Sequence, residues 1–159
     1  MPLVKINARD IIIQVAEANG ATWTAIGGLN SAVPNASENE EVVDTTSFDS
    51  KGHYEQEVIQ RGATLELEGF QLKDSANGQP DSGQARVEIL ASQVGAESLG
   101  KIRFRHPMDT TWKVWTATFT IGEHGGGNND KAAWAVTITR SGPSTGEPVS
   151  AIETIEAGQ

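Results

Sequence analysis

The sequence predicts a mainly β protein, either a β-sandwich or a partly open β-barrel, with one flanking α-helix. Three observations support this fold class. Short segments rich in β-branched and aromatic residues recur along the chain, and clusters of Gly, Asn, Ser and Pro separate them. A single segment has the spacing of apolar residues that an amphipathic helix requires. The chain has 159 residues, with 17 glycines and 6 prolines, which suits one domain of many short elements.

The N-terminal part predicts a β-hairpin. Residues 10–17 contain a run of isoleucines followed by Val15, and residues 21–26 alternate around Trp23, as is typical of strands. The pair Asn19-Gly20 lies between these segments and favours a tight two-residue turn.

The next segment, residues 28–54, is expected to be a long loop. Residues 27–39 are rich in Gly, Asn, Ser and Pro, and residues 47–54 are again polar, with a strand expected between them at 42–46. Long loops inside compact domains are usually either functional or disordered. We therefore expect this loop to be weakly ordered in an isolated molecule and to become ordered on a neighbouring one.

Residues 63–70 predict a strand with one apolar face and one acidic face. Leu65 and Leu67 alternate with Glu66 and Glu68, and side chains two residues apart lie on the same face of a strand. The two glutamates therefore mark a polar sheet face.

Residues 84–96 predict the helix. Its apolar stripe consists of Val87, Leu90, Ala91 and Val94. Asp81 or Ser82 can cap its start, and Gly95 is the expected end. Because the stripe is one-sided, the helix should pack on a sheet.

The C-terminal half predicts three further strands. Residues 101–106 alternate basic and apolar side chains, and residues 112–121 and 132–139 are rich in Trp, Val, Thr and Phe. A glycine-rich hairpin loop at 122–130 joins the last two of these. Residues 1–142 then form one domain with about seven strands, and residues 143–159 form either a final strand or an extended arm.

Charge and composition exclude several classes of function. The formal charge is −9, and an acidic protein repels the phosphates of nucleic acids and of anionic membranes. There is no cysteine, which excludes disulfides and thiolate metal sites. The first residues lack the pattern of a signal peptide, and no apolar run is long enough to span a membrane, so we expect synthesis in the cytoplasm.

No group of residues predicts catalysis, a metal site or a cofactor. The three histidines are not at metal-ligand spacing, and neither a nucleotide-binding motif nor a hydrolase motif is present. The acidic cluster in residues 38–44 lacks the glycine that a calcium-binding loop needs, which favours a solvated surface. We therefore expect a protein that is not an enzyme.

Two sets of side chains have alternative interpretations. Lys101, Arg103 and Arg105 form either a solvated sheet face or a basic surface that meets acidic residues of an identical neighbour. The four tryptophans either pack in the core, which is the commoner role, or stack on sugars. They are Trp23, Trp112, Trp115 and Trp134.

Four short motifs resemble, in their order and spacing, those of the major tail tube proteins of long-tailed bacteriophages. Residues 23–28 match an early pattern W-x-x-I-x-G, and residues 42–50 match an acidic segment rich in Thr and Ser. Residues 100–107 end in the expected proline, and residues 137–142 resemble a late strand that leads to glycine. The resemblance covers residues 23–142.

The resemblance implies a virion protein of the phage tail, with a fold shared by phage tail tubes and type VI secretion tubes. Six copies would form a ring, and stacked rings would form a hollow tube. The tube would enclose the tape measure protein, meet tail terminator and distal tail proteins at its ends, and conduct double-stranded DNA without specific binding. No cofactor and no membrane are implied. The acidity would suit a lumen along which DNA slides.

The resemblance also indicates where subunits should meet. Segment 28–54 would bridge rings, the C-terminal segment is a second candidate, and Glu66 and Glu68 would mark a polar face that lines either the lumen or the exterior. The residues expected in contacts between subunits or rings are Asn30, Pro34, Glu38, Glu40, Glu41, Asp49, Lys51, Tyr54, Arg103 and Arg105.

Two alternatives stay open at this point. The chain could be the inner tube subunit of a contractile tail, a bacteriocin or a secretion-like injection system, because these share the fold. A carbohydrate-binding β-sandwich with exposed tryptophans is the less favoured alternative.

Overall fold

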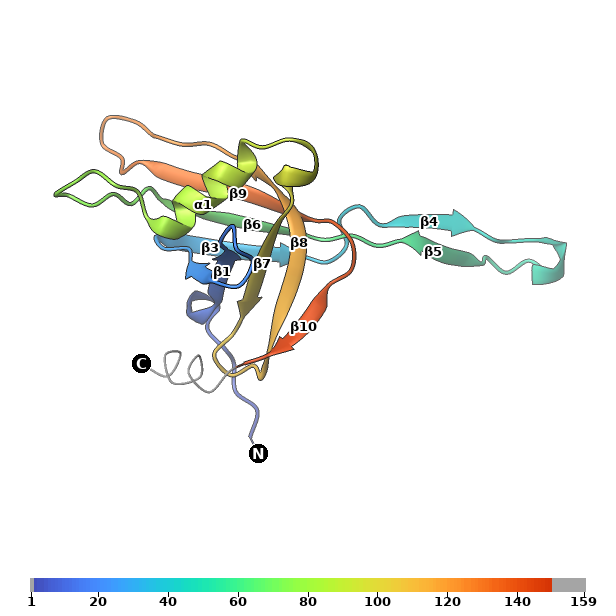
Figure 1. The fold of residues 1–159 in the computed structure, drawn as a ribbon. Helices are drawn as coiled ribbons and strands as arrows, with labels where there is room; N and C mark the ends of the chain where they lie inside the picture. Colours follow the sequence, from blue (N-terminus) through green and yellow to red (C-terminus); the bar gives the residue numbers. More distant parts are fainter. Residues whose placement is uncertain (1, 150–159) are drawn as a thin grey trace.

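The computed structural model describes residues 2–149, and these residues are mainly β structure (Figure 1). The strands are β1 (Ile12–Ala16), β2 (Trp23–Ala25), β3 (Leu29–Asn35), β4 (Glu41–Asp44), β5 (Gln56–Gln60), β6 (Thr64–Phe70), β7 (Gly100–Arg105), β8 (Thr111–Ile121), β9 (Ala133–Arg140) and β10 (Thr145–Pro148). The helices are α1 (Ser82–Ala91) and three 3₁₀ turns, η1 (Ala8–Asp10), η2 (Phe48–Ser50) and η3 (Gly95–Ser98).

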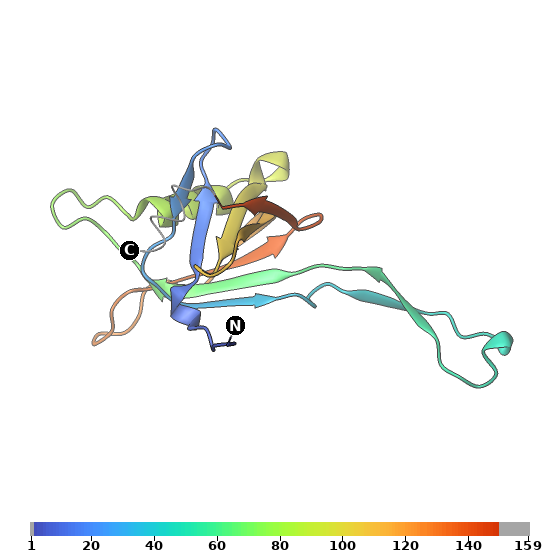
Figure 2. The ribbon, with the colours of Figure 1, turned by 90° about the horizontal axis from the view of Figure 1, so that it is seen from below.

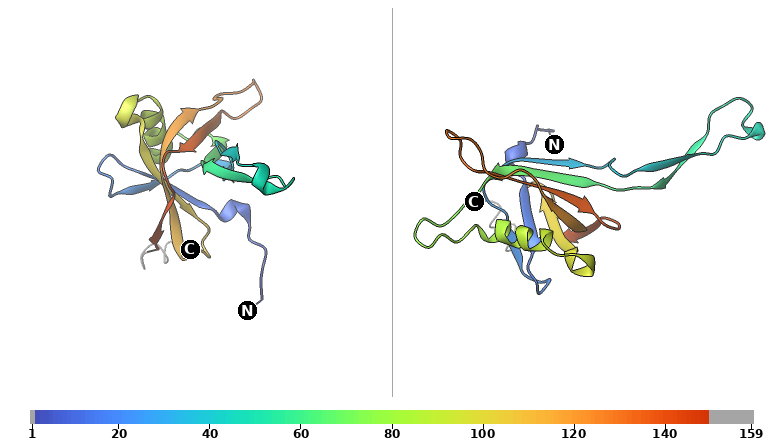
Figure 3. Two further views of the ribbon diagram at one scale, coloured as in Figure 1. Left: turned by 90° about the vertical axis from the view of Figure 1, so that its right-hand side faces the viewer. Right: turned by 90° about the horizontal axis from the view of Figure 1, so that it is seen from above.

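Eight strands form one antiparallel sheet, in which the main path runs β2-β1-β7-β8-β9-β6-β3 and β10 pairs with β8. The sheet coils around its apolar face, as Figure 3 shows, but stays open because its terminal strands β2 and β3 are not neighbours. The predicted mainly β fold with a flanking helix is therefore confirmed in its partly open form. The predicted N-terminal hairpin is also confirmed, as β1 and β2.

The core lies between the coiled sheet and α1. On β6, Leu65 and Leu67 are fully buried, and Leu67 lies opposite Val136 of β9 and Ala32 of β3. Alternation of apolar and polar residues places one face of each strand in this core, as predicted. Trp134, Val136 and Ile138 of β9 share it.

Helix α1 packs against β8, β1 and β2, as expected from its one-sided stripe. Asp81 caps it by accepting a hydrogen bond from the Gln84 backbone N–H at 3.2 Å. The helix is shorter than predicted: it ends at Ala91, and Val94 lies beyond it and is exposed. The Ser92 hydroxyl bonds the Ile89 carbonyl, a local bond that favours the end of a helix over its continuation.

The prediction that residues 28–54 form a long loop is wrong, because most of this segment is strand and ordered turn. Residues 29–35 form β3, an edge strand of the main sheet, and β4 pairs with β5 in a second, two-stranded sheet. Pro34 and the asparagines disfavour a strand locally, but an edge strand tolerates proline, and pairing with β6 determines the conformation. The two-stranded sheet with its tip, residues 36–61, is the arm; it extends far from the rest of the chain, called the body (Figures 1 and 2).

The segment after Gly142 contributes a short final strand, β10, which pairs with β8. The rest of the predicted C-terminal arm or strand, residues 150–159, lies outside the described residues. Of the helices that the structure describes, none has the length and hydropathy to cross a membrane. The domain boundary at residue 142 stays a prediction.

Candidate assembly surface

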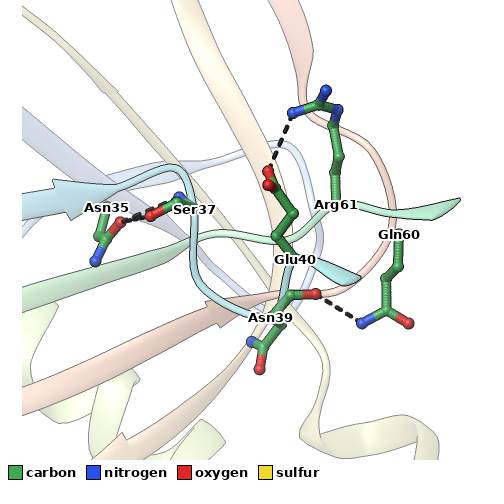
Figure 4. A network of polar contacts seen from close by, with 6 residues as sticks. All are labelled: Asn35, Ser37, Asn39, Glu40, Gln60 and Arg61. Carbon is green, nitrogen blue, oxygen red and sulfur yellow. Dashed lines mark hydrogen bonds and ion pairs between the residues drawn. The ribbon is translucent and has the colours of Figure 1, made fainter. Parts of the chain in front are cut away.

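The base of the arm is fixed by polar contacts between its two strands (Figure 4). Arg61 forms an ion pair with Glu40 at 3.2 Å, and the Gln60 side chain donates to the Asn39 carbonyl at 2.7 Å. Asn35 accepts hydrogen bonds from the backbone and hydroxyl of Ser37, which close the turn after β3. The arm therefore leaves the body as a continuation of the β3–β6 ribbon in a defined direction.

The arm exposes apolar side chains that its own structure does not cover. These are Val42, Val43, Phe48, Tyr54, Val58 and Ile59. An isolated two-stranded ribbon is marginally stable in water because neither face has a layer to pack on. Clustered exposed apolar side chains of this kind mark interaction surfaces.

The tip of the arm is a hydrogen-bonded turn that presents Phe48. Ser47 and Ser50 form a reciprocal capping box around η2, and the Ser50 hydroxyl donates to a carboxylate oxygen of Glu55 at 2.6 Å. Lys51 ends the turn in the left-handed conformation, with φ 56°. Phe48, the first residue of η2, is 100% exposed. A rigid turn that carries a fully exposed aromatic ring is suited to insertion into a partner.

Asp44 connects β4 to the tip. Its carboxylate accepts hydrogen bonds from the side chain and the backbone N–H of Thr46, which hold the pKa of Asp44 below its ordinary value of 3.8. The Thr46 hydroxyl in turn accepts a hydrogen bond from the Glu55 backbone N–H across the arm. These contacts keep the strands paired up to the tip.

Most of the predicted contact residues lie on one continuous ribbon. Asn30 and Pro34 lie on β3, and the arm carries the others except for the two arginines. The arm residues in question are Glu38, Glu40, Glu41, Asp49, Lys51 and Tyr54, all of which are exposed. Their contact with another subunit stays a prediction.

Arg103 and Arg105 do not form an exposed basic face; both are buried on β7. The Arg103 guanidinium lies between the rings of Trp23 and Trp112, at 4.4 and 4.2 Å from their centroids. It donates to the Gln14 amide oxygen at 2.7 Å and lies 3.9 Å from the Glu147 carboxylate. A guanidinium is weakly hydrated and stacks on aromatic faces, so it tolerates this burial.

The Arg105 guanidinium also lies over the Trp112 ring, 4.8 Å from its centroid. Its Nη1 donates to the backbone carbonyls of His106, Pro107 and Asp109. The exposed-surface interpretation of these arginines is therefore wrong. Trp112, Trp115 and Trp134 are buried, so they offer no platform for sugars.

Glu66 and Glu68 lie on the exposed face of β6, opposite the core. In the neighbouring strand β9, Thr137 lies opposite Glu66, and Thr120 of β8 lies opposite Thr137. Alternating threonines on β8 and β9 extend the polar face across three strands, a feature that was not predicted from the sequence. The signal was present as threonine at every second position in residues 116–120 and 137–139. Phe48 was also missed, because an isolated phenylalanine in a polar segment has no periodicity.

Residues 2–149 contain no group of histidine and acidic side chains arranged to hold a metal ion.

Neither a protein-family model nor a curated protein matches the sequence. Solved structures do match the fold. One is a chain in the tail of an empty gene transfer agent particle with C6 symmetry, with a TM-score of 0.62, 20% identity, and coverage of 89% of this chain and 98% of that one. Another is a chain in the virion of a native gene transfer agent particle, with a TM-score of 0.59, 19% identity, and coverage of 90% and 99%. These likenesses show that the chain shares the fold of those particle proteins.

Proposed function

We propose that this chain is a non-enzymatic structural subunit of a phage-like tail, and that copies of it associate into stacked rings that form a hollow tube. The arm carries the proposal. It is a defined hairpin with uncovered apolar side chains and a rigid exposed tip, and such a structure gains its stabilising layer only on another molecule.

The fold likeness supports the type of assembly. The chain shares its fold, over 89% of its own length and 98% of the other chain's, with a chain of a C6-symmetric tail. The open sheet edges at β2 and β3 provide unpaired backbone groups that a neighbouring subunit can satisfy within a ring. We therefore propose six subunits in each ring, with the arm bridging to the next ring.

The polar face of β8, β9 and β6 is the proposed lumen surface. Glu66 and Glu68 provide negative charge and the threonines provide uncharged polar groups. Such a surface repels DNA phosphates, and β6, β8 and β9 carry no basic side chain on this face, so double-stranded DNA passes without being retained. In this function the tube encloses the tape measure protein and meets tail terminator and distal tail proteins at its ends. The inner tube of a contractile tail, a bacteriocin or a secretion-like system is the alternative, since the fold is common to them.

Electron microscopy of the purified protein at increasing concentration tests the proposal, with light scattering of the same samples. We expect ring-shaped particles or hollow tubes with six-fold symmetry. A protein that stays monomeric at millimolar concentration, with no rings or tubes, would show that it is not a tube subunit.

A further inference from the structure

A groove on the body has the properties of a receptor for the arm tip. It lies between the N-terminal segment and the edge strand β3 and has a volume of about 270 Å³. Its apolar lining consists of Ile6, Ala8, Ile11, Ala32, Pro34 and Phe104. A second depression adjoins it and shares Ala8, Ile11 and Ala32. The groove is thus an elongated apolar slot beside an open sheet edge.

The charges at the groove and at the arm tip are complementary. Two exposed basic side chains, Lys113 and Arg9, line the groove and the adjoining depression, together with one exposed carboxylate, Asp109. The arm between residues 44 and 57 carries four acidic side chains and one lysine, a formal charge of −3 without His53. The acidic side chains are Asp44, Asp49, Glu55 and Glu57, and the lysine is Lys51. Complementary charges of this kind orient two apolar surfaces as they approach.

We propose that Phe48 of one copy inserts into this groove of a second copy. The inference rests on the proposed tube function and assigns the two surfaces that join successive subunits along it. Phe48 lies in η2, between β4 and β5, and the arm that these strands form extends away from the body on which the groove lies (Figures 1 and 2), so the contact joins two different copies. Tip and groove are different surfaces, so the contact is heterologous, and a heterologous contact that does not close on itself extends indefinitely. That property is required for stacking rings into a tube.

Removal of the aromatic ring should weaken assembly without affecting the subunit fold. Burying one large apolar side chain corresponds to about a tenfold or greater change in the association constant. We expect Phe48→Ser to raise the critical concentration for tube formation by about tenfold or more, and Phe48→Leu to change it by about threefold or less. The melting temperature of the monomer should be unchanged, because Phe48 makes no buried contact in its own subunit.

Blocking the groove should have the same effect. Ala8→Trp places a bulky side chain in the groove from η1, and we expect a similar rise in critical concentration. Ala96→Trp is the matched control, since Ala96 is also exposed and also lies in a 3₁₀ turn, η3, away from the groove. It should assemble like the unmodified chain.

Photo-crosslinking identifies the partner surface directly. A benzoyl-phenylalanine in place of Phe48 keeps an aromatic ring at the tip and reacts with adjacent C–H bonds on irradiation. In assembled tubes we expect crosslinks between subunits to residues 6–11, 32–34 or 104–113. Tubes that form normally but crosslink elsewhere, or assemble equally well with Phe48→Ser, would refute the tip-in-groove contact and leave the tube function standing. A chain that forms no tubes under any condition would instead refute the tube function itself.

Discussion

Arg103 shows how a cationic residue serves as a packing element inside this fold. Its guanidinium is stacked between Trp23 and Trp112 and anchored by Gln14. We expect Arg103→Lys to lower the free energy of unfolding by about 1–3 kcal/mol, because an ammonium group cannot stack on two rings or reproduce the guanidinium geometry. Urea unfolding followed by tryptophan fluorescence measures this. Lys101→Ala is the control, since Lys101 is exposed on the same strand, and it should change the value by less than about 0.5 kcal/mol. Equal effects of the two substitutions would contradict the stacking role.

At the same scale, Thr46 sets the titration of Asp44. The carboxylate is stabilised by the Thr46 hydroxyl first and by the Thr46 backbone N–H second, which lowers its pKa. We expect Thr46→Val to raise the pKa of Asp44 toward 3.8, as measured by NMR titration of the carboxyl carbon. A lowered pKa in the folded state means that the contact stabilises the arm above pH 3.8 and is lost as pH falls through the lowered pKa. An unchanged pKa of Asp44 in the Thr46→Val variant would show that the Thr46 hydroxyl plays no part.

At the scale of elements, Gly83 determines how closely α1 approaches the sheet. A Cβ at this position would overlap the Ala25 carbonyl and the Ile26 Cα, so a side chain would push the helix away from β2. We expect Gly83→Ala to destabilise the protein by about 1–3 kcal/mol, although alanine is the better helix former. Thermal unfolding checks this against Gly146→Ala, where the added Cβ would meet only an ordinary contact, at 3.8 Å from the Trp112 carbonyl. A stabilised Gly83→Ala variant would show that the helix adapts freely.

The arm is an element that the body does not need for its own core. None of its side chains belongs to the buried cluster, and Asn35 and Thr64 are paired at its base. We expect replacement of residues 37–60 by a short Gly-Ser-rich turn to leave the melting temperature of the body within a few degrees of the unmodified chain and to abolish stacking of rings. Calorimetry and electron microscopy measure the two effects. Long tubes formed by the armless variant would exclude the arm from ring-to-ring contact.

At the scale of the whole molecule, the sequence predicted those features that depend on local patterns and missed those that depend on contacts between distant segments. The alternation around Leu65 and Leu67 correctly predicted both the strand and its buried face, because one residue in two faces the core. Strand β3 was not predicted, because its pairing with β6 outweighs the low strand propensity of Pro34 and its neighbours. The burial of Arg103 depends on Trp23, which is distant in sequence, and on Trp112 of the neighbouring strand β8, so no local pattern within β7 indicates it. Phe48 was likewise not singled out, because its exposure depends on its position at the tip of an arm, and the sequence predicted a loop there.

The net charge of the molecule determines how a tube of it would interact with DNA. The formal net charge of the chain is −9, and the proposed lumen face contributes Glu66 and Glu68 to it. Replacing both by lysine changes the charge of each subunit by +4, to −5, and places basic groups on that face. We expect tubes of Glu66→Lys/Glu68→Lys to retain short double-stranded DNA in a low-salt co-sedimentation assay, with binding that falls steeply as salt rises, whereas unmodified tubes retain none. The triple variant Gln93→Lys/Ala96→Lys/Glu97→Lys makes the same change of charge, +4, at exposed positions around η3, which contacts α1 on the opposite side of the sheet, and it should retain far less DNA. The reason is geometric: inside a tube the face is repeated around the DNA and concentrates the field, while on the exterior each basic group faces open solvent. Equal retention by the two variants would place Glu66 and Glu68 on the outside of the tube.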